Sequence, residues 1–405
     1  MENQNERGLK MMKNSAALDL HRKHQGKMEI QSKVELENGD DLSLAYSPGV
    51  AEPCLEIHND PNDVYEYTMK GNLVGVVTDG TAVLGLGDIG PSASLPVMEG
   101  KALLLKRFAN IDAFPICLDT TDTEEIIRTV KILSPTFGAI NLEDISAPRC
   151  FEIEKRLRAE CNIPVFHDDQ HGTAIVVAAG LMNALKLVHK EISTIKVVIN
   201  GAGAAGIAIT KLLLSLGVTN LMMCDSKGII YNGRPNGMNA QKEEIANLTN
   251  HQEEKGSLKN ALKNADVFIG VSVANVLTQE LIDEMHADPI VFALANPNPE
   301  ILPDLAKLYG VKVIATGRSD YPNQVNNVLA FPGIFRGALD VRATDINDAM
   351  KLAATKAIAS LIQPNELHAD YVIPNPFDPK VVETVSKAVS EAAIESGVAG
   401  LIVQY

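Results

Sequence analysis

Ile163-Pro-Val-Phe-His-Asp-Asp-Gln-His-Gly-Thr173 joins a short apolar segment, two adjacent carboxylates and the beginning of a long apolar segment. The pattern predicts a strand over residues 163–166, a turn through the glycine and a helix over residues 173–188. Ligands of open α/β sheets bind beyond the carboxyl ends of the strands, so Asp168 and Asp169 are candidates for a metal site or for acid–base chemistry. Polar residues ahead of a helix are also typical of an N-cap, and this stretch alone does not separate the two interpretations.

A second pair of carboxylates follows the preceding predicted strand. Between residues 113 and 166 the apolar pattern alternates as a βαβ array does, with strands at 113–118, 138–142 and 163–166 and helices at 122–134 and 148–160. The second of these strands ends at Glu143 and Asp144. Because neighbouring parallel strands end at the same edge of a sheet, both pairs are expected to face one crevice, where hard oxygen ligands suit Mg²⁺ or Mn²⁺.

Zinc is a poor match for the same stretch. His167 and His171 have the i, i+4 spacing of two zinc ligands on a helix, but the glutamate of the H-E-x-x-H motif is absent between them. Cysteine ligands are absent as well. We therefore expect the two histidines to cap the helix or to support the carboxylates.

A first glycine-rich segment, Gly80-Thr-Ala-Val-Leu-Gly-Leu-Gly-Asp-Ile-Gly90, matches the G-x-G-x-x-G dinucleotide signature. Pro91 and Pro96 follow it, so no helix is expected to start on the third glycine, and the segment is interpreted as a tight loop outside the dinucleotide site. The next predicted helix, residues 95–108, carries Lys101 among apolar neighbours. Lost hydration would favour the neutral amine, a possible proton acceptor, although a snorkelling lysine is the alternative.

The N-terminal part of the chain contains one tyrosine in a constrained loop. A helix is predicted over residues 16–24 and a strand over residues 27–34, followed by a turn. Tyr46 then precedes Ser-Pro-Gly, and Pro48 and Gly49 would hold its phenol at a defined place. A buried tyrosine that only packs its ring is the alternative interpretation.

The second glycine-rich segment has the full context of a dinucleotide site. The apolar strand 195–200 runs into Gly201, Gly203, Ala204, Ala205 and Gly206, and an uninterrupted apolar helix follows over residues 207–216. The next strand ends in Asp225, 24 residues after the first glycine, as expected of an acid that binds the adenosine ribose. Asp225 favours NAD because a carboxylate repels the 2′-phosphate of NADP, whereas Ser226 and Lys227 weaken that preference.

Later strands, at 266–270, 289–295 and 312–316, continue this sheet. Asn296 follows one of them in Asn-Pro-Asn-Pro and would line the cofactor mouth, and Asn326-Asn327 follow the last strand. Asparagines next to proline are usually turn formers, which is the alternative for Asn296. Two alanine-rich helices, at 348–362 and 379–395, close the chain.

Composition excludes several classes of function. The net charge of −15 repels nucleic acid and anionic membrane surfaces, and no basic strip with interleaved aromatic residues occurs. Met1–Lys13 lacks an apolar h-region, which predicts no signal peptide, and no run is expected to reach membrane-spanning length. Five scattered cysteines suit reduced thiols in a cytoplasm.

Taken in order, these motifs resemble the malic enzyme family, and its short bacterial form most closely. The resemblance rests on Tyr before Ser-Pro-Gly, Gly-Leu-Gly-Asp, Gly-Lys, Glu-Asp, Asp-Asp and the dinucleotide fold, and it covers nearly the whole chain. It implies an α/β protein with an N-terminal substrate and metal domain, residues 1–170. A Rossmann-type, doubly wound NAD(P)-binding domain with C-terminal helices, residues 171–405, would follow. It also implies a homodimer.

The resemblance further implies roles for individual residues. Tyr46 would be the general acid, Lys101 the general base and Asp168 a partner that tunes Lys101. Glu143, Asp144 and Asp169 would bind the metal, and Asn296 with Asn327, or less well Asn326, would bind the substrate. The longer members of the family carry a substrate-binding arginine at the position of Ala82. The resemblance therefore assigns no residue to neutralise the second substrate carboxylate.

The expected reaction is oxidation of L-malate by NAD, or by NADP, followed by loss of CO₂ to give pyruvate. A divalent ion acidifies the hydroxyl, a base removes its proton, and an acid on the other face protonates the carbon that loses CO₂. Two alternatives are a 2-hydroxy acid dehydrogenase without decarboxylation and a non-catalytic nucleotide-sensing module.

Overall fold

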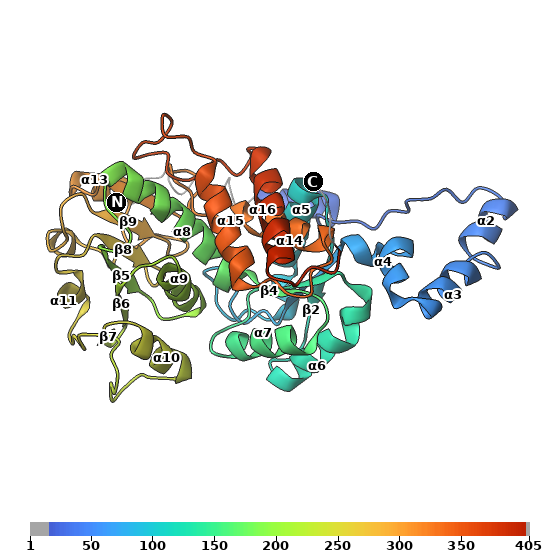
Figure 1. The fold of residues 1–405 in the computed structure, drawn as a ribbon, viewed down its shortest axis with the longest axis horizontal. Helices are drawn as coiled ribbons and strands as arrows, with labels where there is room; N and C mark the ends of the chain where they lie inside the picture. The colour runs from blue at the N-terminus through green and yellow to red at the C-terminus, as the bar shows by residue number, and fades with distance from the viewer. Residues whose placement is uncertain (1–15, 402–405) are drawn as a thin grey trace.

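Two mainly parallel β-sheets, one in each half of the chain, organise the structure, a computed structural model that describes residues 16–401. Helices pack on both sheets, and the N-terminal helices α2 and α3 extend to one end of the long axis (Figure 1). The segment Met1–Lys13, for which no signal peptide is predicted, lies outside the described residues. The architecture is α/β, as the alternating pattern predicts.

The first sheet has the strand order β2-β1-β3-β4, and all its pairs are parallel. Its strands are β1 (Leu73–Thr78), β2 (Asp112–Cys117), β3 (Ala139–Leu142) and β4 (Val165–His167). Val77 pairs with Leu142 and Leu142 pairs with His167, so three strands end in register. The residues that follow these strands therefore gather at one edge of the sheet.

The second sheet has the order β10-β9-β8-β5-β6-β7 and is parallel except for the β6–β7 pair. Its strands are β5 (Lys196–Asn200), β6 (Asn220–Asp225), β7 (Gly228–Ile229), β8 (Val267–Gly270), β9 (Ile290–Ala293) and β10 (Val313–Thr316). The strand order reverses direction on either side of β5, as in a doubly wound nucleotide-binding fold. The residues that follow β5 therefore lie at a topological switch point.

Helices connect the strands in both halves. The first half contains a helix at residues 16–24 and α2 (Gly39–Ala45), α3 (Ala51–Asn59), η1 (Pro61–Asp63), α4 (Val64–Tyr67), η2 (Met69–Asn72), α5 (Pro91–Ala109), α6 (Thr123–Leu133), η3 (Ser134–Thr136), α7 (Arg149–Glu160) and α8 (Asp168–Val188). The second half contains α9 (Ala204–Ser215), α10 (Ala240–Leu248), α11 (Leu258–Leu262), α12 (Gln279–Ile282), α13 (Pro303–Leu308), η4 (Asn327–Leu329), α14 (Phe331–Asp340), α15 (Asp348–Ser360) and α16 (Lys380–Glu395).

Helix α8 begins five residues earlier than its apolar pattern predicts. Asp168 and Asp169 form its first turn, where carboxylates interact favourably with the helix dipole, and Gly172 lies inside the helix instead of in a turn. With 21 residues, α8 is by length and composition apolar enough to cross a membrane, so the expectation that no run reaches that length was wrong. Two thirds of its most apolar window is buried in the protein, as in any core helix.

The C-terminal helices return to the first half of the chain. α14 packs on α16 and on α5, while α15 packs on α16 and α8. Gly337 permits the close crossing of α14 and α16, since an added Cβ would lie 2.4 Å from the Ser386 carbonyl oxygen. The largest buried cluster joins side chains of β1, α5, α8, β5 and these three helices, so both halves of the chain share one core.

Two local predictions were wrong. Residues 27–34 form no strand, because no neighbouring strand lies beside them to complete the hydrogen-bond ladder. The segment Gly80–Gly90 is followed at once by a helix, since α5 starts at Pro91 with Gly90 as its N-cap. Proline is favoured at the first helical position because its fixed φ suits a helix and its missing N–H has no partner there to lose.

Candidate active site

Four carboxylates meet at the edge of the first sheet. Glu143 and Asp144 follow β3, and Asp168 and Asp169 begin α8 directly after β4. The register of β3 and β4 places these two chain segments side by side. The expectation that the two carboxylate pairs lie together at one edge of the sheet is therefore confirmed.

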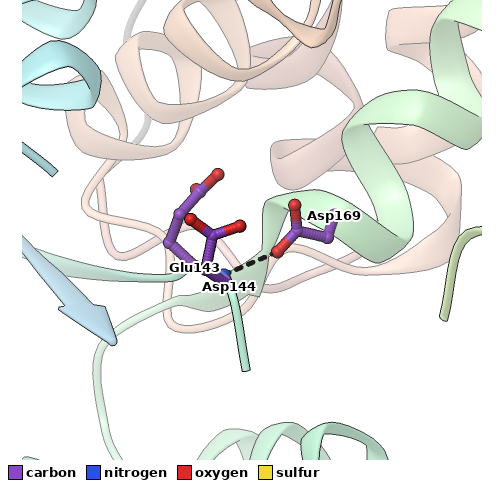
Figure 2. Close-up of side chains that lie close together, drawn as sticks. All are labelled: Glu143, Asp144 and Asp169. Atoms are coloured by element: carbon purple, nitrogen blue, oxygen red, sulfur yellow. Dashed lines mark hydrogen bonds between the residues drawn. The ribbon is translucent and has the colours of Figure 1, made fainter. Parts of the chain in front are cut away.

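Three of these carboxylates are arranged as a possible metal site. One oxygen from each of Glu143, Asp144 and Asp169 lies within 4.8 Å of the others. Figure 2 shows the three side chains converging, with the Asp144 N–H donating to Asp169 Oδ2 at 2.7 Å. Asn141 Nδ2 donates to Glu143 Oε2 at 2.8 Å, which fixes the second oxygen of that group.

The charges of this cluster fit a divalent cation. Asp144 Oδ2 and Asp168 Oδ1 are buried and have no hydrogen-bond partner among the described residues. Burial, with the neighbouring charge of Asp169, raises the pKa of Asp144 to about 8, and burial raises the pKa of Glu143 to about 7. Burial likewise raises the pKa of Asp168 to about 7 and that of Asp169 to about 6. These buried carboxylates therefore carry negative charge that their surroundings do not fully offset, and a bound metal ion would offset it.

Among residues 16–401, Lys101 is the one lysine or arginine in contact with the cluster. Its Nζ lies 2.5 Å from Asp168 Oδ2 and 3.1 Å from Glu143 Oε1, and it sits 4.2 Å from the centre of the Phe331 ring. The side chain is buried, so it does not snorkel to solvent. Burial alone would lower its pKa, but the charges of Asp168 and Glu143 outweigh burial and raise it. The expectation of a neutral amine was therefore wrong for these surroundings, because its neighbours are carboxylates as well as apolar groups.

The two predicted asparagines before α14 have different positions. Asn327 Nδ2 donates to Asp168 Oδ2, which places its amide beside Lys101. The Asn326 side chain caps η4 instead, accepting from the Val328 N–H at 3.0 Å. Asn296 is exposed, and its backbone lies against Gly85 while its amide lies near Gly317.

The loop Gly80–Gly90 packs over the carboxylates instead of over the nucleotide turn. The Ala82 N–H donates to the Asp144 carbonyl oxygen at 2.9 Å. No residue of this loop lines the cavity beside Gly201. The loop therefore lies apart from the cavity beside Gly201, although the reason given for placing it outside the dinucleotide site, the absence of a following helix, was wrong.

Tyr46 is not part of this cluster within its own chain. It is the C-cap of α2, its side chain is 68% exposed, and α2 lies at the far end of the molecule from β4 (Figure 1). The alternative of a buried tyrosine is wrong. The polar partners of Lys101 within residues 16–401 are Asp168 and Glu143.

The second glycine-rich segment forms the turn from β5 into α9. Gly201 has a φ of +126°, and a Cβ on Gly206 would lie 1.9 Å from the Gly201 carbonyl oxygen, so both positions require glycine. At Gly203, the N-cap of α9, a Cβ would meet nothing within 4 Å. The open turn, with the amides of Ala204, Ala205 and Gly206 in the first turn of α9, has the geometry of a pyrophosphate site.

A cavity of about 860 Å³ adjoins this turn and is lined by Asp225, Ser226 and Lys227 among others. Asp225 is already neutralised, since Arg234 Nη2 lies 2.5 Å and Lys242 Nζ 2.6 Å from its Oδ2. Burial would raise the pKa of Asp225, but these two hydrogen-bonded cations hold it well below its usual range. Repulsion of a 2′-phosphate by Asp225 is therefore weaker than its sequence position suggests.

Sequence reasoning missed several of these groups. Arg234 and Lys242 follow Asp225 at irregular distances in a polar segment, so no periodic pattern marks them. Phe331 precedes Pro332 at the start of α14, where only tertiary packing brings it to Lys101. None of the three belongs to a motif with fixed spacing.

The two histidines near the cluster have separate surroundings. His171 Nε2 lies 2.7 Å from Glu154 Oε1; burial lowers the pKa of His171. Both ring nitrogens of His167 lack a hydrogen-bond partner among the described residues, although Nδ1 lies 3.8 Å from Asp169 Oδ2, and burial lowers the pKa of His167 to about 4. His167 precedes α8, but its side chain makes no cap bond, so the capping alternative is wrong for it.

A larger cavity of about 990 Å³ lies on another side of α8, between α7 and α9. Glu154 and His171 line it, but none of the residues predicted for the site does. It is therefore separate from the carboxylates and from the glycine-rich turn.

The chain matches two family models in sequence order. Residues 25–158 match the malic enzyme N-terminal domain, and residues 170–397 match the malic enzyme NAD-binding domain. Together the two models span most of the chain.

Curated relatives carry names from the same family. A bifunctional malic/malolactic enzyme of Bacillus subtilis is 67% identical over 96% of this chain and 94% of its own. An NAD-dependent malic enzyme of Geobacillus stearothermophilus is 61% identical over 92% of this chain and 78% of its own. An NADP-dependent malic enzyme of Halomonas elongata is 51% identical over 96% of this chain and 95% of its own.

Solved structures agree with these relatives. The crystal structure of an NAD-dependent malic enzyme from Thermotoga maritima has a TM-score of 0.90 and 52% identity, covering 92% of this chain and 98% of that one. Sequence and fold thus match over nearly the same length, as the resemblance read from the motifs predicts. The chain belongs to the malic enzyme family.

Proposed function

We propose that this chain catalyses the oxidative decarboxylation of L-malate to pyruvate and CO₂, with a divalent metal ion and with reduction of NAD or NADP. The observation that carries the proposal is Lys101, buried between Asp168 and Glu143 beside three convergent carboxylates. The names of the relatives, which include both NAD- and NADP-dependent malic enzymes, support the same activity.

The proposed metal ligands are Glu143, Asp144 and Asp169, and the ion would be Mg²⁺ or Mn²⁺. When bound, it would acidify the malate hydroxyl, stabilise the charge that develops as CO₂ leaves, and offset the negative charge around Lys101. The unpaired buried oxygen of Asp144 and the raised pKa values of the cluster support this assignment.

The proton transfers are assigned to two side chains. Lys101 Nζ, as the neutral amine that the positive charge of a bound ion would favour, would accept the proton of the 2-hydroxyl group, and a nicotinamide bound beside it would take the hydride of C2. Asp168, which is hydrogen-bonded to Lys101, is a positioning residue that holds the amine in place. The hydroxyl of Tyr46, which would have to come from the second chain of the dimer proposed below, would then protonate C3 after the distal carboxylate has left, which gives pyruvate.

The remaining polar groups would bind the two small molecules. Asn327 and Asn296 are proposed to hold the substrate, with Asn327 favoured over Asn326 because its amide lies beside Asp168. The turn from Gly201 to Gly206 would bind the pyrophosphate at the N-terminus of α9. Asp225 would bind the adenosine ribose together with its two cations, which is compatible with either cofactor.

We also propose a homodimer in a reducing, cytoplasmic setting, with a domain boundary near residue 170. The five cysteines are all unpaired, which supports the setting. The two family models meet between residues 158 and 170, which supports the boundary. The exposed apolar residues of the N-terminal helices support self-association.

The test is an assay with L-malate, Mn²⁺ and either NAD or NADP, repeated with EDTA, in which reduced cofactor and pyruvate are both quantified. We expect metal-dependent reduction with one pyruvate for each reduced cofactor. Reduction that leaves stable oxaloacetate would instead identify a dehydrogenase without decarboxylation. Cofactor binding with no turnover of malate would favour a nucleotide-sensing module.

The Bacillus subtilis relative supports a second candidate activity, because its name combines malic and malolactic activity. If the hydride returned to C2 of pyruvate before the products separate, the net reaction would convert malate to lactate and CO₂ without net reduction of the cofactor. Lactate formed with only a catalytic amount of NAD would demonstrate this activity. Pyruvate as the sole product would exclude it.

A further inference from the structure

Three chain segments from both halves of the protein meet beside the proposed metal ligands. The backbone of Asn296, after β9, lies against the first glycine-rich loop, where a Cβ on Gly85 would come within 2.8 Å of the Asn296 carbonyl oxygen. The Asn296 amide lies beside Gly317, where a Cβ would be 3.5 Å from its Oδ1. The segment that begins at Gly317 reaches Asn327, whose amide donates to Asp168. The proposed substrate site therefore lies between these three segments and the carboxylates.

The third of these segments is a loop with a fixed position. The Val325 N–H donates to the Thr316 carbonyl oxygen at 2.8 Å, and Thr316 also pairs with Gln324 through an isolated bridge. Residues 317–323 therefore form a closed loop at the carboxyl end of β10. Within it, the buried side chain of Asn323 donates to a carbonyl oxygen of β10 at 3.0 Å. Side chains of this loop are thus held at a defined place beside the site.

The proposed substrate brings negative charge to a site that is already rich in it. L-malate has two carboxylates, and four carboxylates of the protein surround Lys101. A bound metal ion would serve the end of the substrate whose hydroxyl it acidifies, whereas the distal carboxylate would remain without an opposite charge. A charge that loses water without gaining an opposite charge is strongly destabilised. The site therefore requires a second cationic side chain.

Few cations are available for that purpose. The segments that surround the site are residues 79–90, 143–149, 168–172, 295–299 and 317–327. Their sequences contain no lysine and two arginines, Arg149 and Arg318. Helix α5 adds Lys101, which is already in contact with two carboxylates. The choice for the distal carboxylate is therefore between the two arginines.

Arg149 is fully engaged within the protein. Its Nη1 lies 2.8 Å from Asp79 Oδ2 and 2.9 Å from the Thr121 carbonyl oxygen. Its Nη2 donates to the hydroxyl groups of Thr81 and Ser146. Asp79 is buried, so Arg149 offsets a charge that would otherwise be unpaired in the interior. Arg149 is therefore needed where it is and holds the beginning of the glycine-rich loop.

Arg318 is held loosely by comparison. Its Nε lies 2.8 Å from Asp320 Oδ1 and its Nη2 2.5 Å from Asp320 Oδ2, and its guanidinium lies 5.3 Å from the centre of the Tyr321 ring. The side chains of Arg318 and Asp320 are 33% and 55% exposed, so water screens this pair. The two bonds to Asp320 use one edge of the planar guanidinium. Its Nη1–Nη2 edge can bind another carboxylate through two parallel hydrogen bonds.

We propose that Arg318 binds the distal carboxylate of the substrate, the one that leaves as CO₂, and that it selects dicarboxylic over monocarboxylic 2-hydroxy acids. Asp320 is a positioning residue that orients the guanidinium and remains its partner after CO₂ has left. The inference rests on the proposed function, since it names a substrate-binding group for that reaction. It also supplies the positive charge that Ala82, in the neighbouring glycine-rich loop, does not provide.

The test compares the wild type with Arg318→Gln, both as full chains with Mn²⁺ and saturating cofactor. The substrate is L-malate, and the competitive inhibitor is its analogue with an amide in place of the distal carboxylate, which keeps the shape but lacks the charge. Arg318→Gln should raise KM for L-malate about 10–100-fold, as expected when a hydrogen bond to a charged group is lost. The kcat should change less than about threefold, because Arg318 binds a charge that disappears as CO₂ leaves.

The inhibition constant of the amide analogue separates recognition from a structural role. It should be nearly the same in the wild type and in Arg318→Gln, so the preference of the wild type for a carboxylate over an amide should disappear in the variant. Arg318→Lys should recover part of that preference, because it keeps the charge but not the planar fork. Arg22→Gln is the matched control: it removes the arginine of another exposed Arg–Asp pair, outside the site, and should behave as the wild type does.

Two outcomes would overturn the inference while the proposed function stands. One is an unchanged KM for L-malate in Arg318→Gln, and the other is an equal rise in this KM and in the inhibition constant of the amide. If the wild type does not oxidise L-malate, the proposed function fails, and the shifts in melting temperature that L-malate and its amide cause with Mn²⁺ decide the inference. A larger shift with L-malate that Arg318→Gln abolishes would support it, and equal shifts in the wild type would overturn it.

Discussion

Carboxylates at strand ends have opposite surroundings in the two sheets of this protein. Four carboxylates gather at the ends of β3 and β4 around Lys101, and burial raises their pKa values. At the end of β6 a single carboxylate, Asp225, is shared by Arg234 and Lys242, which lower its pKa. The first site has four carboxylates for one lysine, whereas the second has two cations for one carboxylate, so only the first has the excess of negative charge that suits a metal ion.

The largest expected effect is on catalysis at the first site. Replacing Asp144→Asn removes a proposed metal ligand and should lower kcat/KM for malate on the order of 10³-fold, more than the 10–100-fold loss typical of groups that only support a ligand. Activity would be titrated with Mn²⁺. The control is Asp119→Asn, an exposed carboxylate just beyond β2 in the same sheet, which should stay fully active. Equal losses in both variants would contradict the assignment.

The second site should respond mainly through stability. Asp225→Asn leaves Arg234 buried without its partner and should lower the free energy of unfolding by about 3 kcal/mol, measured by urea unfolding. The exposed pair Lys307–Asp370 is the control, and Asp370→Asn should cost about 1 kcal/mol or less. Similar costs for the two substitutions would argue against the buried ion pairs as a source of stability.

The sign of the pH dependence at Asp225 follows from its lowered pKa. The unfolded chain binds this proton more readily than the folded one, so the ion pairs stabilise the fold above about pH 4, the usual pKa of an aspartate. That contribution is lost as the pH falls through the folded-state pKa. The difference in the free energy of unfolding between the wild type and Asp225→Asn should therefore become smaller on acidification. A difference that stays constant with pH would contradict the lowered pKa of Asp225.

Removal of the metal should reverse which of two proteins, the wild type or the Asp144→Asn variant of the first site, is the more stable. In EDTA, Asp144→Asn should be more stable than the wild type by about 1–2 kcal/mol, because the neutral amide relieves repulsion among the carboxylates. Added Mn²⁺ should raise the melting temperature of the wild type but not of the variant. Thermal unfolding with and without Mn²⁺ measures both effects. A wild type that Mn²⁺ leaves unchanged would weaken the case for a metal site.

The smallest expected effect concerns the cofactor. Because Asp225 is neutralised, Lys227 on the cavity wall should attract a 2′-phosphate, and Lys227→Ala should lower kcat/KM for NADP about tenfold while changing that for NAD less than about twofold. The control Lys259→Ala removes a lysine that is paired with Glu284 outside the cavity. A parallel loss with both cofactors would show that Lys227 does not discriminate between them.

Both strand-end sites could be located from sequence because strand, turn and helix patterns are local. The strand ahead of Glu143 and the glycines ahead of α9 have fixed spacing, and parallel strands bring their ends together by geometry. The start of α8 was missed because carboxylates ahead of an apolar segment suit a loop as well as a first helical turn. The helix after Gly90 was missed because proline was interpreted only as a breaker.

The sequence by itself determined the α/β class, the glycine turn at Gly201 and the two carboxylate pairs, since each depends on residues a few positions apart. Only the tertiary structure decided the charge state of Lys101 and of Asp225, because their partners come from distant segments and the balance of burial against charge has no local signature. The tertiary structure also decided the place of Tyr46. A loop motif fixes how a side chain is held, but which active site it reaches depends on how whole segments pack.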